Sequence, residues 1–525
     1  MPRSLAERIA ENAARSPDGL AYATASERMT WAEYDARSTA LASRCVDLGC
    51  EPGTRMAVLL PDGPGVHAAL VGCEKAGLVA VGISPRAGYK EIEHLLRNTG
   101  ASGLVSRRVH EDRDLATFAR ELGLPVHLAV DDELAGFSSP DPSKLPGRSL
   151  ASNDVFLLNS TSGTTGMPKV VVHDQDRWFA FHDLAVATGD LSSRDVFMSV
   201  VPAPFGFGIW TSHVTPTVLG APTIVTPHFS ADETLALIER HRVSVLAAVS
   251  TQFVMLLESP QLEQHDLSSL RLLYTGGEVV PSARAAEFED RTGAVVLQFY
   301  GSNETGAVCG TSLRDDRERR LHTSGRVVAE MNVRLFDEAG ADVTQTGRGQ
   351  PGCKGPTLSR GYWEDDVENA KLTRPDGWMM LGDIVTIDDD GYLTVIGRTD
   401  DFIIRGGKNI SGPAVEQEVA AHPAVSLAAV VAMPDPIFGE RVCAYVELRP
   451  GTTLTLAELT EEMRSRDVSK ENLPERLEIL DSLPRGSGGK IAKQKLREDI
   501  RRRLEAAAGV VRRVARLHIS LRILW

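Results

Sequence analysis

Apolar and polar positions follow two different periods along the chain, and the two kinds of segment alternate at short spacing. Residues 66–77, 231–244 and 282–293 place apolar side chains at helical spacing, and each segment leads directly into an apolar run of strand length. Helices that alternate with continuous apolar strands are typical of parallel sheets covered by helices. From about residue 30 to 400 the sequence therefore predicts an α/β fold rich in parallel strands.

Two later segments have a different pattern. Residues 330–396 contain short alternating strands separated by turn signals, which predict a small β-rich subdomain. A polar, Gly-rich connection then opens a segment with its own helices and strands. We expect a large N-terminal domain over 1–399 and a mobile, smaller α+β domain over 400–500. The basic tail, 501–525, predicts a solvated terminal helix or a non-native extension.

Composition excludes several classes of protein. A chain of 525 residues is too long for one ordinary core, and its net charge of -14 argues against a nucleic-acid-binding protein. Its six cysteines are scattered without a C-x-x-C pair, which argues against a disulfide framework or a zinc site. The N-terminus has no apolar signal core, and no apolar stretch is long enough to span a bilayer. We expect a cytoplasmic protein without a membrane span.

A segment crowded with hydroxyl groups and glycines, NSTSGTTGMPKVVVH, occupies residues 159–173. Gly163 and Gly166 would leave backbone N–H groups accessible in a nest for phosphate oxygens. The hydroxyl groups supply rotatable donors, and Lys169 supplies a positive charge. The spacing differs from that of the common P-loop. The segment predicts either a phosphate-binding loop or a plain Ser/Thr turn between two strands.

Other polar residues follow apolar strands. Residues 274–281, YTGGEVVP, form a Gly-rich break, and Glu304 lies where a strand ends, as active-site residues of open α/β sheets do. The Glu304 carboxylate is a hard ligand suited to Mg²⁺, although a solvated loop acid is the simpler alternative. Asp383 and Arg398 suit ribose hydroxyls. Composition alone makes Lys490 an ordinary surface lysine on a Gly-rich segment.

In their order along the chain, STSGTTGMPK, YGSNETG, GYW, LGD, GRTDDFIIRGGKNIS and PRGSGGKIAKQKLR resemble the motifs of the adenylate-forming superfamily. This superfamily contains acyl- and aryl-CoA synthetases, adenylation domains of peptide synthetases, and luciferases. The chain resembles benzoate- and acyl-CoA ligases most, from about residue 5 to 500. The resemblance implies that a carboxylate attacks the α-phosphate of ATP and releases pyrophosphate. A thiol, usually that of coenzyme A, then attacks the acyl carbon and releases AMP.

The same resemblance implies roles for residues that match the family's motifs. Lys490, Glu304 and Lys169 would be catalytic, and Lys490 would reach in from the smaller domain to bridge the carboxylate and the α-phosphate. Glu304 and Thr161 would hold Mg²⁺, and Asp400 would be the hinge about which the smaller domain rotates. The ATP-binding set would be Thr161, Ser162, Gly163, Thr164, Thr165, Gly166, Lys169, Gly277, Glu278, Val279, Tyr300, Gly301, Ser302, Asn303, Glu304, Asp383, Arg398 and Lys490. The pantetheine arm of CoA would lie against Arg405, Gly406 and Gly407.

The sequence departs from the family's pattern in the segment expected to hold the acid. Phe205 stands where many acyl-CoA synthetases have His, and no acidic residue is present to pair with the ammonium group of an amino acid. Asn303 also replaces the usual Thr. The residues of the segment predict an apolar pocket, although core packing is an equal alternative for Phe207 and Trp210. The expected pocket set is Phe205, Phe207, Gly208, Trp210, Val249, Ser250 and Gly276.

The substrates that follow are ATP, CoA and a small apolar carboxylic acid. Aryl, alicyclic and short-to-medium aliphatic acids all remain open, with a benzoate-type acid preferred because aromatic walls favour a flat ring. Two alternatives are an enzyme that loads a carrier-protein thiol in trans and a non-catalytic nucleotide-binding relative. A luciferase-like oxygenase has the least support, since nothing in the sequence marks oxidation of the adenylate.

Overall fold

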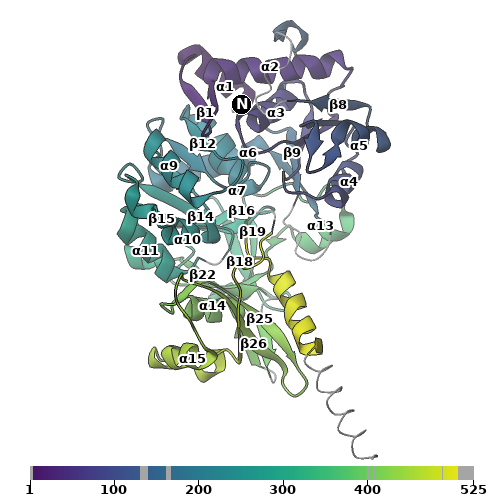
Figure 1. Cartoon of the computed structure of the whole chain (residues 1–525). Helices are drawn as coiled ribbons and strands as arrows, with labels where there is room; N and C mark the ends of the chain where they lie inside the picture. The colour runs from purple at the N-terminus through teal and green to yellow at the C-terminus, as the bar shows by residue number, and fades with distance from the viewer. Residues whose placement is uncertain are drawn as a thin grey trace, which may run out of the picture. The chain divides into compact units, whose positions relative to one another are not determined.

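The computed structural model describes residues 4–130, 140–160, 167–278, 280–398, 402–405, 408–486 and 489–506. It divides into two compact units, one containing residues 1–395 and the other beginning at Ile396 (Figure 1). The predicted hinge, Asp400, lies outside the described residues. The domain boundary near residue 400 stays a prediction.

The largest sheet of the first unit contains nine strands within the described residues. Its central strands are parallel, and only its two edges are antiparallel, as expected for a sheet covered by helices. The strand order is β17 (Arg326–Val327), β16 (Gly306–Gly310), β15 (Val295–Ser302), β14 (Leu272–Gly276), β13 (Val245–Ala247), β11 (Phe197–Ser199), β12 (Thr223–Val225), β1 (Leu20–Ala23) and β2 (Arg28–Thr30).

A second sheet, of six strands in the described part of the chain, has the same parallel character apart from the antiparallel pair β9–β10. Its order is β10 (Val170–Asp174), β9 (Val155–Ser160), β4 (Val79–Gly82), β3 (Arg55–Leu59), β5 (Gly103–Ser106) and β8 (Val126–Ala129). A short hairpin pairs β6 (Val109–His110) with β7 (Arg113–Asp114). The prediction of helix-covered, parallel-rich sheets is confirmed.

The expected β-rich segment forms a third sheet, made of β18 (Asn332–Phe336), β19 (Arg348–Lys354), β20 (Met379–Met380), β21 (Asp383–Ile387) and β22 (Leu393–Arg398). The second unit has a sheet of its own, which contains β23 (Phe402–Arg405), β24 (Lys408–Ser411), β25 (Val425–Asp435), β26 (Gly439–Leu448) and β27 (Arg476–Ile479). Its core is separate, and Val415, Val430 and Val442 lie within it.

Helices connect the strands of both units. In the first unit they are α1 (Leu5–Arg15), α2 (Trp31–Asp47), α3 (Pro64–Lys75), α4 (Tyr89–Asn98), α5 (Leu115–Glu121), α6 (Gln175–Gly189), α7 (Gly206–Gly208), α8 (Thr215–Leu219), α9 (Ala231–His241), α10 (Ser250–Glu258), α11 (Ser282–Thr292), α12 (Arg317–His322) and α13 (Asp366–Leu372). In the second they are α14 (Gly412–Ala420), α15 (Leu456–Ser465) and a helix over 493–506. Short 3₁₀ turns are η1 (Pro142–Lys144), η3 (Leu262–Gln264), η4 (Thr344–Thr346) and η6 (Lys470–Asn472).

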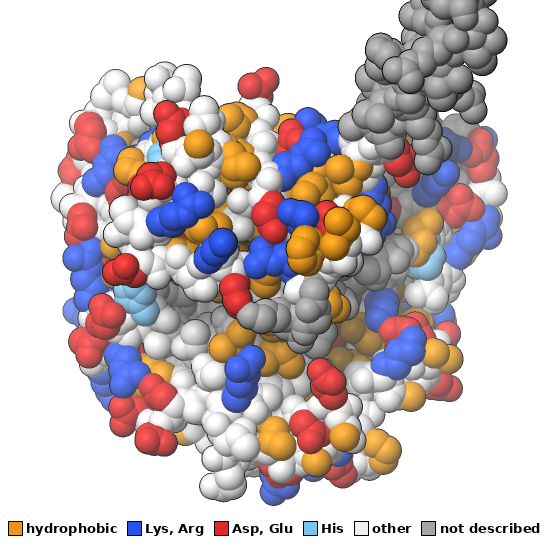
Figure 2. All heavy atoms as spheres, turned by 90° about the horizontal axis from the view of Figure 1, so that it is seen from below, with side chains coloured by type: hydrophobic (Ala, Val, Ile, Leu, Met, Phe, Trp, Pro, Cys, Tyr) orange, Lys and Arg blue, Asp and Glu red, His pale blue; other side chains and the backbone are white. Residues whose placement is uncertain are grey.

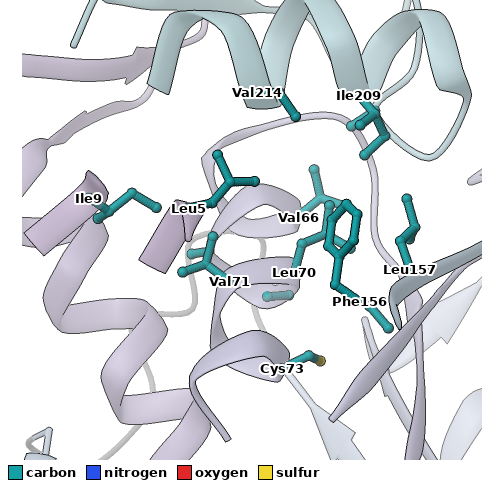
Figure 3. Packing of buried hydrophobic residues seen from close by; sticks show 14 of the residues in the cluster. Leu5, Ile9, Val66, Leu70, Val71, Cys73, Phe156, Leu157, Ile209 and Val214 are labelled. Atoms are coloured by element: carbon teal, nitrogen blue, oxygen red, sulfur yellow. The ribbon is translucent and has the colours of Figure 1, made fainter. Parts of the chain in front are cut away.

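The main core of the first unit forms where α3 packs between helices and the second sheet. Every residue of α3 is buried, which explains why this helix lacks the polar face of a surface helix. Figure 3 shows α3 side chains beside those of α1, β9 and a π-helical segment, η2 (Ile209–Val214). Leu5 and Ile9 anchor α1, whose first turn is closed by a capping box between Ser4 and Glu7.

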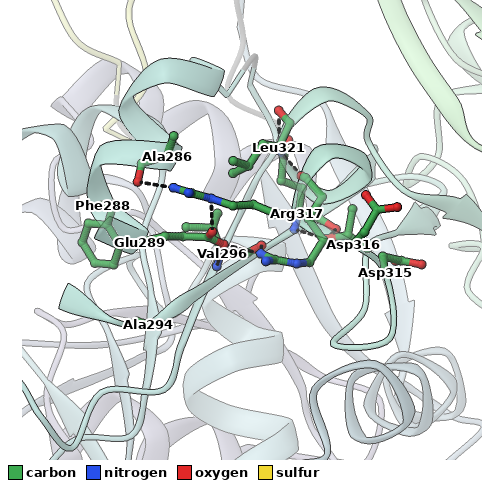
Figure 4. A network of polar contacts seen from close by, with 12 residues as sticks. Ala286, Phe288, Glu289, Ala294, Val296, Asp315, Asp316, Arg317 and Leu321 are labelled. Carbon is green, nitrogen blue, oxygen red and sulfur yellow. Dashed lines mark hydrogen bonds and ion pairs between the residues drawn. The ribbon is translucent and has the colours of Figure 1, made fainter. Parts of the chain in front are cut away.

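Ion pairs hold the short helix α12 against α11. Arg317 donates to Glu289 at 3.0 Å, to Asp290 at 2.6 Å and to the Ala286 carbonyl at 3.0 Å (Figure 4). Arg320 also pairs with Glu289. These contacts fix the edge of the sheet that carries β15 and β16.

The protein surface carries charges of both signs (Figure 2), and the cysteines are buried. On the face seen in Figure 2, acidic and basic side chains are interspersed with apolar ones. The six cysteines are unpaired and buried: Cys45, Cys50, Cys73, Cys309, Cys353 and Cys443. Within the described residues, no helix combines the length and apolar character needed to cross a bilayer.

Candidate active site

The hydroxyl-rich segment joins two antiparallel strands at one edge of the second sheet. Ser160, the last residue of β9, pairs with Val170, the first residue of β10. The expected phosphate-binding residues Thr161, Ser162, Gly163, Thr164, Thr165 and Gly166 lie outside the described residues. Their role stays a prediction, and the geometry of the site rests on the residues that flank them.

Lys169 belongs to a cluster of charged and aromatic side chains. Its ammonium group forms an ion pair with Glu368 of α13 and lies 5.0 Å from the centroid of the Tyr362 ring. The Tyr362 hydroxyl donates to Glu304 Oε1 at 2.8 Å. Hydrogen bonds from Lys169 and Lys371 lower the pKa of Glu368 to about 2, so this carboxylate is ionised at neutral pH. A phosphate arriving at Lys169 would compete directly with Glu368 for the ammonium group.

Glu304 lies in the tight hairpin between β15 and β16. The Ser302 amide donates to Thr305 Oγ1 at 2.9 Å, and the Glu304 amide donates to Ser302 Oγ at 3.2 Å. Gly301 is required here because a Cβ on it would lie 1.7 Å from the Gly306 carbonyl oxygen. The hairpin therefore holds Glu304 in a defined place, where Tyr362 reaches it.

A second hydrogen bond joins the same hairpin to the third sheet. The Tyr300 hydroxyl donates to Asp383 Oδ2 at 2.7 Å. Burial, together with the negative charge of Asp383, raises the pKa of Tyr300, so its hydroxyl keeps its proton and acts as a donor. The expected adenine-side residue and the expected ribose-binding carboxylate are thus brought together. The Arg398 side chain lies outside the described residues.

The Glu304 carboxylate suits a magnesium ion that is shared with a triphosphate. Mg²⁺ usually takes one or two carboxylates and completes its shell with water and substrate phosphates. Glu304 supplies one such carboxylate, whereas Thr161 lies outside the described residues. Within the described part of the chain, no three His, Cys, Asp or Glu side chains gather as a metal cage. The residues present suit a metal that arrives with ATP.

The segment expected to hold the acid turns sharply after β11. Phe205 precedes α7, which continues as the π-helix η2 and then as α8. Gly208 cannot carry a side chain, because a Cβ would lie 2.1 Å from the Pro202 carbonyl oxygen. Close packing of this turn against its own backbone explains the second glycine of the segment.

An aromatic cluster forms around the acid segment. The Phe207 ring lies 4.8 Å from that of Phe299, and the Trp210 ring lies 5.1 Å from the rings of Phe299 and Tyr274. Trp210 is 3% exposed and packs in the main core with Phe181, whereas Phe207 and Phe299 are only partly buried. The burial of Trp210 favours core packing for this residue, whereas Phe207 is more accessible, and the pocket role of both residues stays a prediction.

Strand ends bring further expected pocket residues beside this cluster. Gly276 pairs with Phe299 in parallel register, and a Cβ on Gly276 would lie 2.4 Å from the Phe299 carbonyl oxygen. Gly277 follows with a positive φ of 78°. Glu278 Oε1 accepts from the Thr251 amide at 3.3 Å. Val249 is the N-cap of α10, and Ser250 is its first residue. Val279 lies outside the described residues.

The remaining expected residues belong to the second unit. Arg405 ends β23 and donates to Glu475 at 2.8 Å and to the Glu471 carbonyl at 2.9 Å. Gly406 and Gly407 lie outside the described residues. Lys490 also belongs to this unit. Roles for Lys490 and Arg405 in the reaction stay predictions.

Sequence reasoning missed a chain of buried polar side chains behind the site. Asn159, His173 and Arg177 are at most 1% exposed and are hydrogen bonded in series, ending at the backbone of Asn303. Tyr362 and Glu368 were also given no role. The available signal was an Asn and a His inside otherwise apolar strands, where an unpartnered polar group would be costly.

Comparison with known proteins places this geometry in a family. Residues 9–363 match the model of the AMP-binding enzyme family, and residues 414–490 match that of the AMP-binding enzyme C-terminal domain. The chain belongs to the AMP-binding enzyme family. It is therefore an adenylate-forming enzyme of the acyl- and aryl-CoA ligase type, and the resemblance found in the sequence is confirmed.

Relatives of this AMP-binding enzyme span nearly its whole length. A medium-chain fatty-acid–CoA ligase of Escherichia coli K12 is 30% identical, over 95% of this chain and 91% of the relative. A feruloyl-CoA synthase of an Amycolatopsis species is 33% identical, over 92% and 96%. A crystal structure of the anthranilate CoA ligase AuaEII with anthranoyl-AMP is similar with a TM-score of 0.87 and 25% identity, over 95% and 98%. These relatives act on acids of different shape, so they leave the acid of this enzyme open.

Proposed function

We propose that this AMP-binding enzyme is an ATP-dependent acid:CoA ligase that activates an apolar carboxylic acid, with a benzoate-type acid preferred. The observation that carries the proposal is the convergence of Lys169, Tyr362 and Glu304, with the Tyr300–Asp383 pair on the same hairpin as Glu304. A cation and a metal-binding carboxylate are the groups needed to hold a triphosphate.

In the first half-reaction a carboxylate oxygen of the acid attacks the α-phosphorus of ATP. A new P–O bond forms, the bond to the β-phosphate breaks, and pyrophosphate leaves. Lys169 would hold the leaving phosphates, Glu304 would hold Mg²⁺, and Asp383 would bind the ribose. Mg²⁺ would supply charge neutralisation on the phosphates. Such an in-line attack by an anion on a polyanion depends on positioning and electrostatic stabilisation.

In the second half-reaction the thiol of CoA gives up its proton and attacks the acyl carbon. A thioester bond forms and AMP leaves with the electron pair of the broken acyl–phosphate bond. A carrier protein bearing the same phosphopantetheine thiol would undergo the same step. Six unpaired cysteines are consistent with a reducing compartment such as the cytoplasm.

An apolar acid is supported by the residues around α7. Phe207 and Phe299 are partly buried rings in edge-to-face contact, and Gly276 lies directly beside Phe299. Segment 202–210 has no carboxylate that could pair with an ammonium group. A flat, uncharged ring suits these walls better than an α-amino acid does.

The test is a panel of carboxylic acids in ATP–pyrophosphate exchange, followed by thioester detection. The panel contains benzoates, cyclohexane carboxylate, straight-chain acids of four to about ten carbons and phenylalanine, the last as an amino acid of similar apolar size. We expect exchange with benzoates above the aliphatic acids, none with phenylalanine, and a thioester with CoA. A thioester formed only on carrier proteins would replace CoA as the acceptor. Absence of exchange with every acid would make the chain a non-catalytic nucleotide-binding relative.

A further inference from the structure

A buried carboxamide joins two segments of the site. Asn159 is fully buried and is the second-to-last residue of β9. Its Oδ1 accepts from Asn303 Nδ2 at 2.7 Å, and its Nδ2 donates to the Pro204 carbonyl at 2.9 Å. One side chain thus contacts the hairpin that carries Glu304 and the turn that carries Phe205.

His173 fixes the orientation of that carboxamide. Its Nε2 lies 2.7 Å from Asn159 Oδ1, and its Nδ1 lies 2.6 Å from Arg177 Nη1. A guanidinium nitrogen can only donate, so Nδ1 is the acceptor and Nε2 carries the proton that Asn159 Oδ1 accepts. Burial, followed by the positive charge of Arg177, lowers the pKa of His173, which keeps the imidazole neutral.

Arg177 links His173 to two backbone segments. Its Nη1 also donates to the Asn303 carbonyl at 3.0 Å, and its Nε donates to the Thr357 carbonyl at 2.9 Å. The guanidinium group is thus bound to the backbone just before Glu304 and to the segment that leads to Tyr362. Its position behind the hairpin is set by these carbonyls.

The acid segment also packs against the Asn303 carboxamide. A Cβ placed on Gly206 would lie 2.7 Å from Asn303 Oδ1, so only glycine lets the turn approach this closely. Asn303, which replaces the family's usual Thr, is hydrogen bonded to Asn159 and lies close to Gly206. A shift of Asn303 would move both the Glu304 hairpin and the turn beside Phe205.

From this geometry we propose that His173 is a positioning residue for adenylation, which, through Asn159, fixes the Glu304 hairpin and the 204–208 turn against the end of β9. The proposal rests on the proposed function, because adenylation is the step that uses both the Glu304 hairpin and the acid segment. The set Asn159, His173, Arg177 and Asn303 is called the carboxamide relay below.

The test compares His173→Leu with His173→Gln. Gln can donate to Asn159 and accept from Arg177 as the imidazole does, whereas Leu can do neither. We expect H173L to lower kcat for acid-dependent pyrophosphate exchange by about 10²-fold, since an ångström-scale misplacement costs that much, and H173Q to stay within about fivefold of wild type. Thioester formation from a supplied acyl-adenylate should fall far less in H173L, because that step does not use the triphosphate.

Two further variants guard against simple misfolding. His182→Leu removes another buried imidazole of α6, one that is not a member of the relay, and should leave exchange unchanged. Asn303→Ala breaks the relay at a partly exposed position and should lower exchange as H173L does. Wild-type exchange in H173L, or equal loss in H173L and H173Q at equal thermal stability, would overturn the proposal.

A binding measurement separates this proposal from the proposed function. Calorimetric titration with Mg²⁺ and a non-hydrolysable ATP analogue needs no acid. If the wild type binds the analogue but exchanges with no acid, the proposed function fails, and weaker binding by H173L than by H173Q would still support the relay. Equal affinity of the two variants would reject it.

Discussion

At the scale of single residues, the ion pair between Asp195 and Arg271 gives the clearest dependence of stability on pH. Arg271 donates to both oxygens of Asp195 at 2.8 Å, and the Ser192 amide and the Ser244 hydroxyl each add a hydrogen bond at 2.8 Å. Burial by itself would raise the pKa of Asp195. These donors outweigh it, and the pKa lies below its ordinary value.

A carboxyl whose pKa is lower in the folded state stabilises the fold above its unfolded pKa of about 3.9, and this contribution is lost as the pH falls through the folded pKa. We expect Asp195→Asn to reduce the free energy of unfolding at pH 7 by about 2 kcal/mol, and the difference from wild type to shrink below pH 4. Urea unfolding at pH 7 and at pH 3 measures both.

The matched control is Glu93→Gln, which breaks an exposed pair with Arg97 at 2.9 Å. An exposed pair of this kind contributes within about 0.5 kcal/mol. A difference between D195N and wild type that is as large at pH 3 as at pH 7 would mean that the carboxyl's ionisation is not what stabilises this region.

Some residues of the candidate site can be predicted from the sequence, and others cannot. Glu304 and Lys169 can be predicted as candidate site residues because charged residues in Gly-rich motifs resemble a known pattern. Arg177 cannot be predicted in this way, because its partners are backbone carbonyls from segments more than a hundred residues away in the chain. Hydrogen bonds to carbonyls depend on the folded path of the backbone and leave no motif.

At the scale of elements, hydrophobic periodicity predicted the strands and helices well where local propensity and packing agree. The segments expected at 231–244 and 282–293 are α9 and α11, each followed by a buried strand. The π-helix after α7 was not predicted. Its wider turn arises where Gly208 packs directly against the Pro202 backbone, a tertiary contact that periodicity does not contain.

The aromatic residues of α7 and η2 differ in burial, so their removal should have different effects. Trp210→Ala should reduce the free energy of unfolding by about 3–5 kcal/mol, because the ring lies in the core against Phe181, Tyr274 and Phe299. Phe207→Ala should cost less stability and should instead shift the acid preference toward bulkier acids, since this ring is only partly buried.

Thermal unfolding and the ratio of kcat/KM for two acids of different bulk measure the two effects. Phe118→Ala removes a buried ring of the second sheet's core and is a control for loss of stability without a change in acid preference. If W210A changed the acid ratio more than F207A did, Trp210 rather than Phe207 would be the wall of the pocket.

At the scale of the whole molecule, the residues expected to take part in the reaction are divided between two compact units. The first unit carries Lys169, Glu304 and Asp383, and the second carries Lys490. We expect Lys490→Ala to lower pyrophosphate exchange by about 10²-fold, as loss of one charge at the transition state does, and to leave thioester formation from a supplied acyl-adenylate within a few-fold of wild type.

Lys495→Ala is the matched control, because Lys495 is an exposed lysine of the neighbouring helix over 493–506. It should leave both half-reactions unchanged. Near-normal exchange by K490A would show that this lysine has no part in adenylation and would return it to the surface lysine that composition alone suggests.

The buried cysteines make it possible to measure local opening of each unit separately. Cys443 lies on β26 in the second unit, whereas the other thiols lie in the first. A thiol-specific dye can react with them only when the surrounding structure opens. In dilute denaturant, mass spectrometry of tryptic peptides shows the order in which the cysteines become labelled, and this order ranks the two units by local stability. Because these thiols are buried, acyl groups of thioesters in an assay should not transfer to the cysteines of the folded enzyme, and free CoA should not exchange with them.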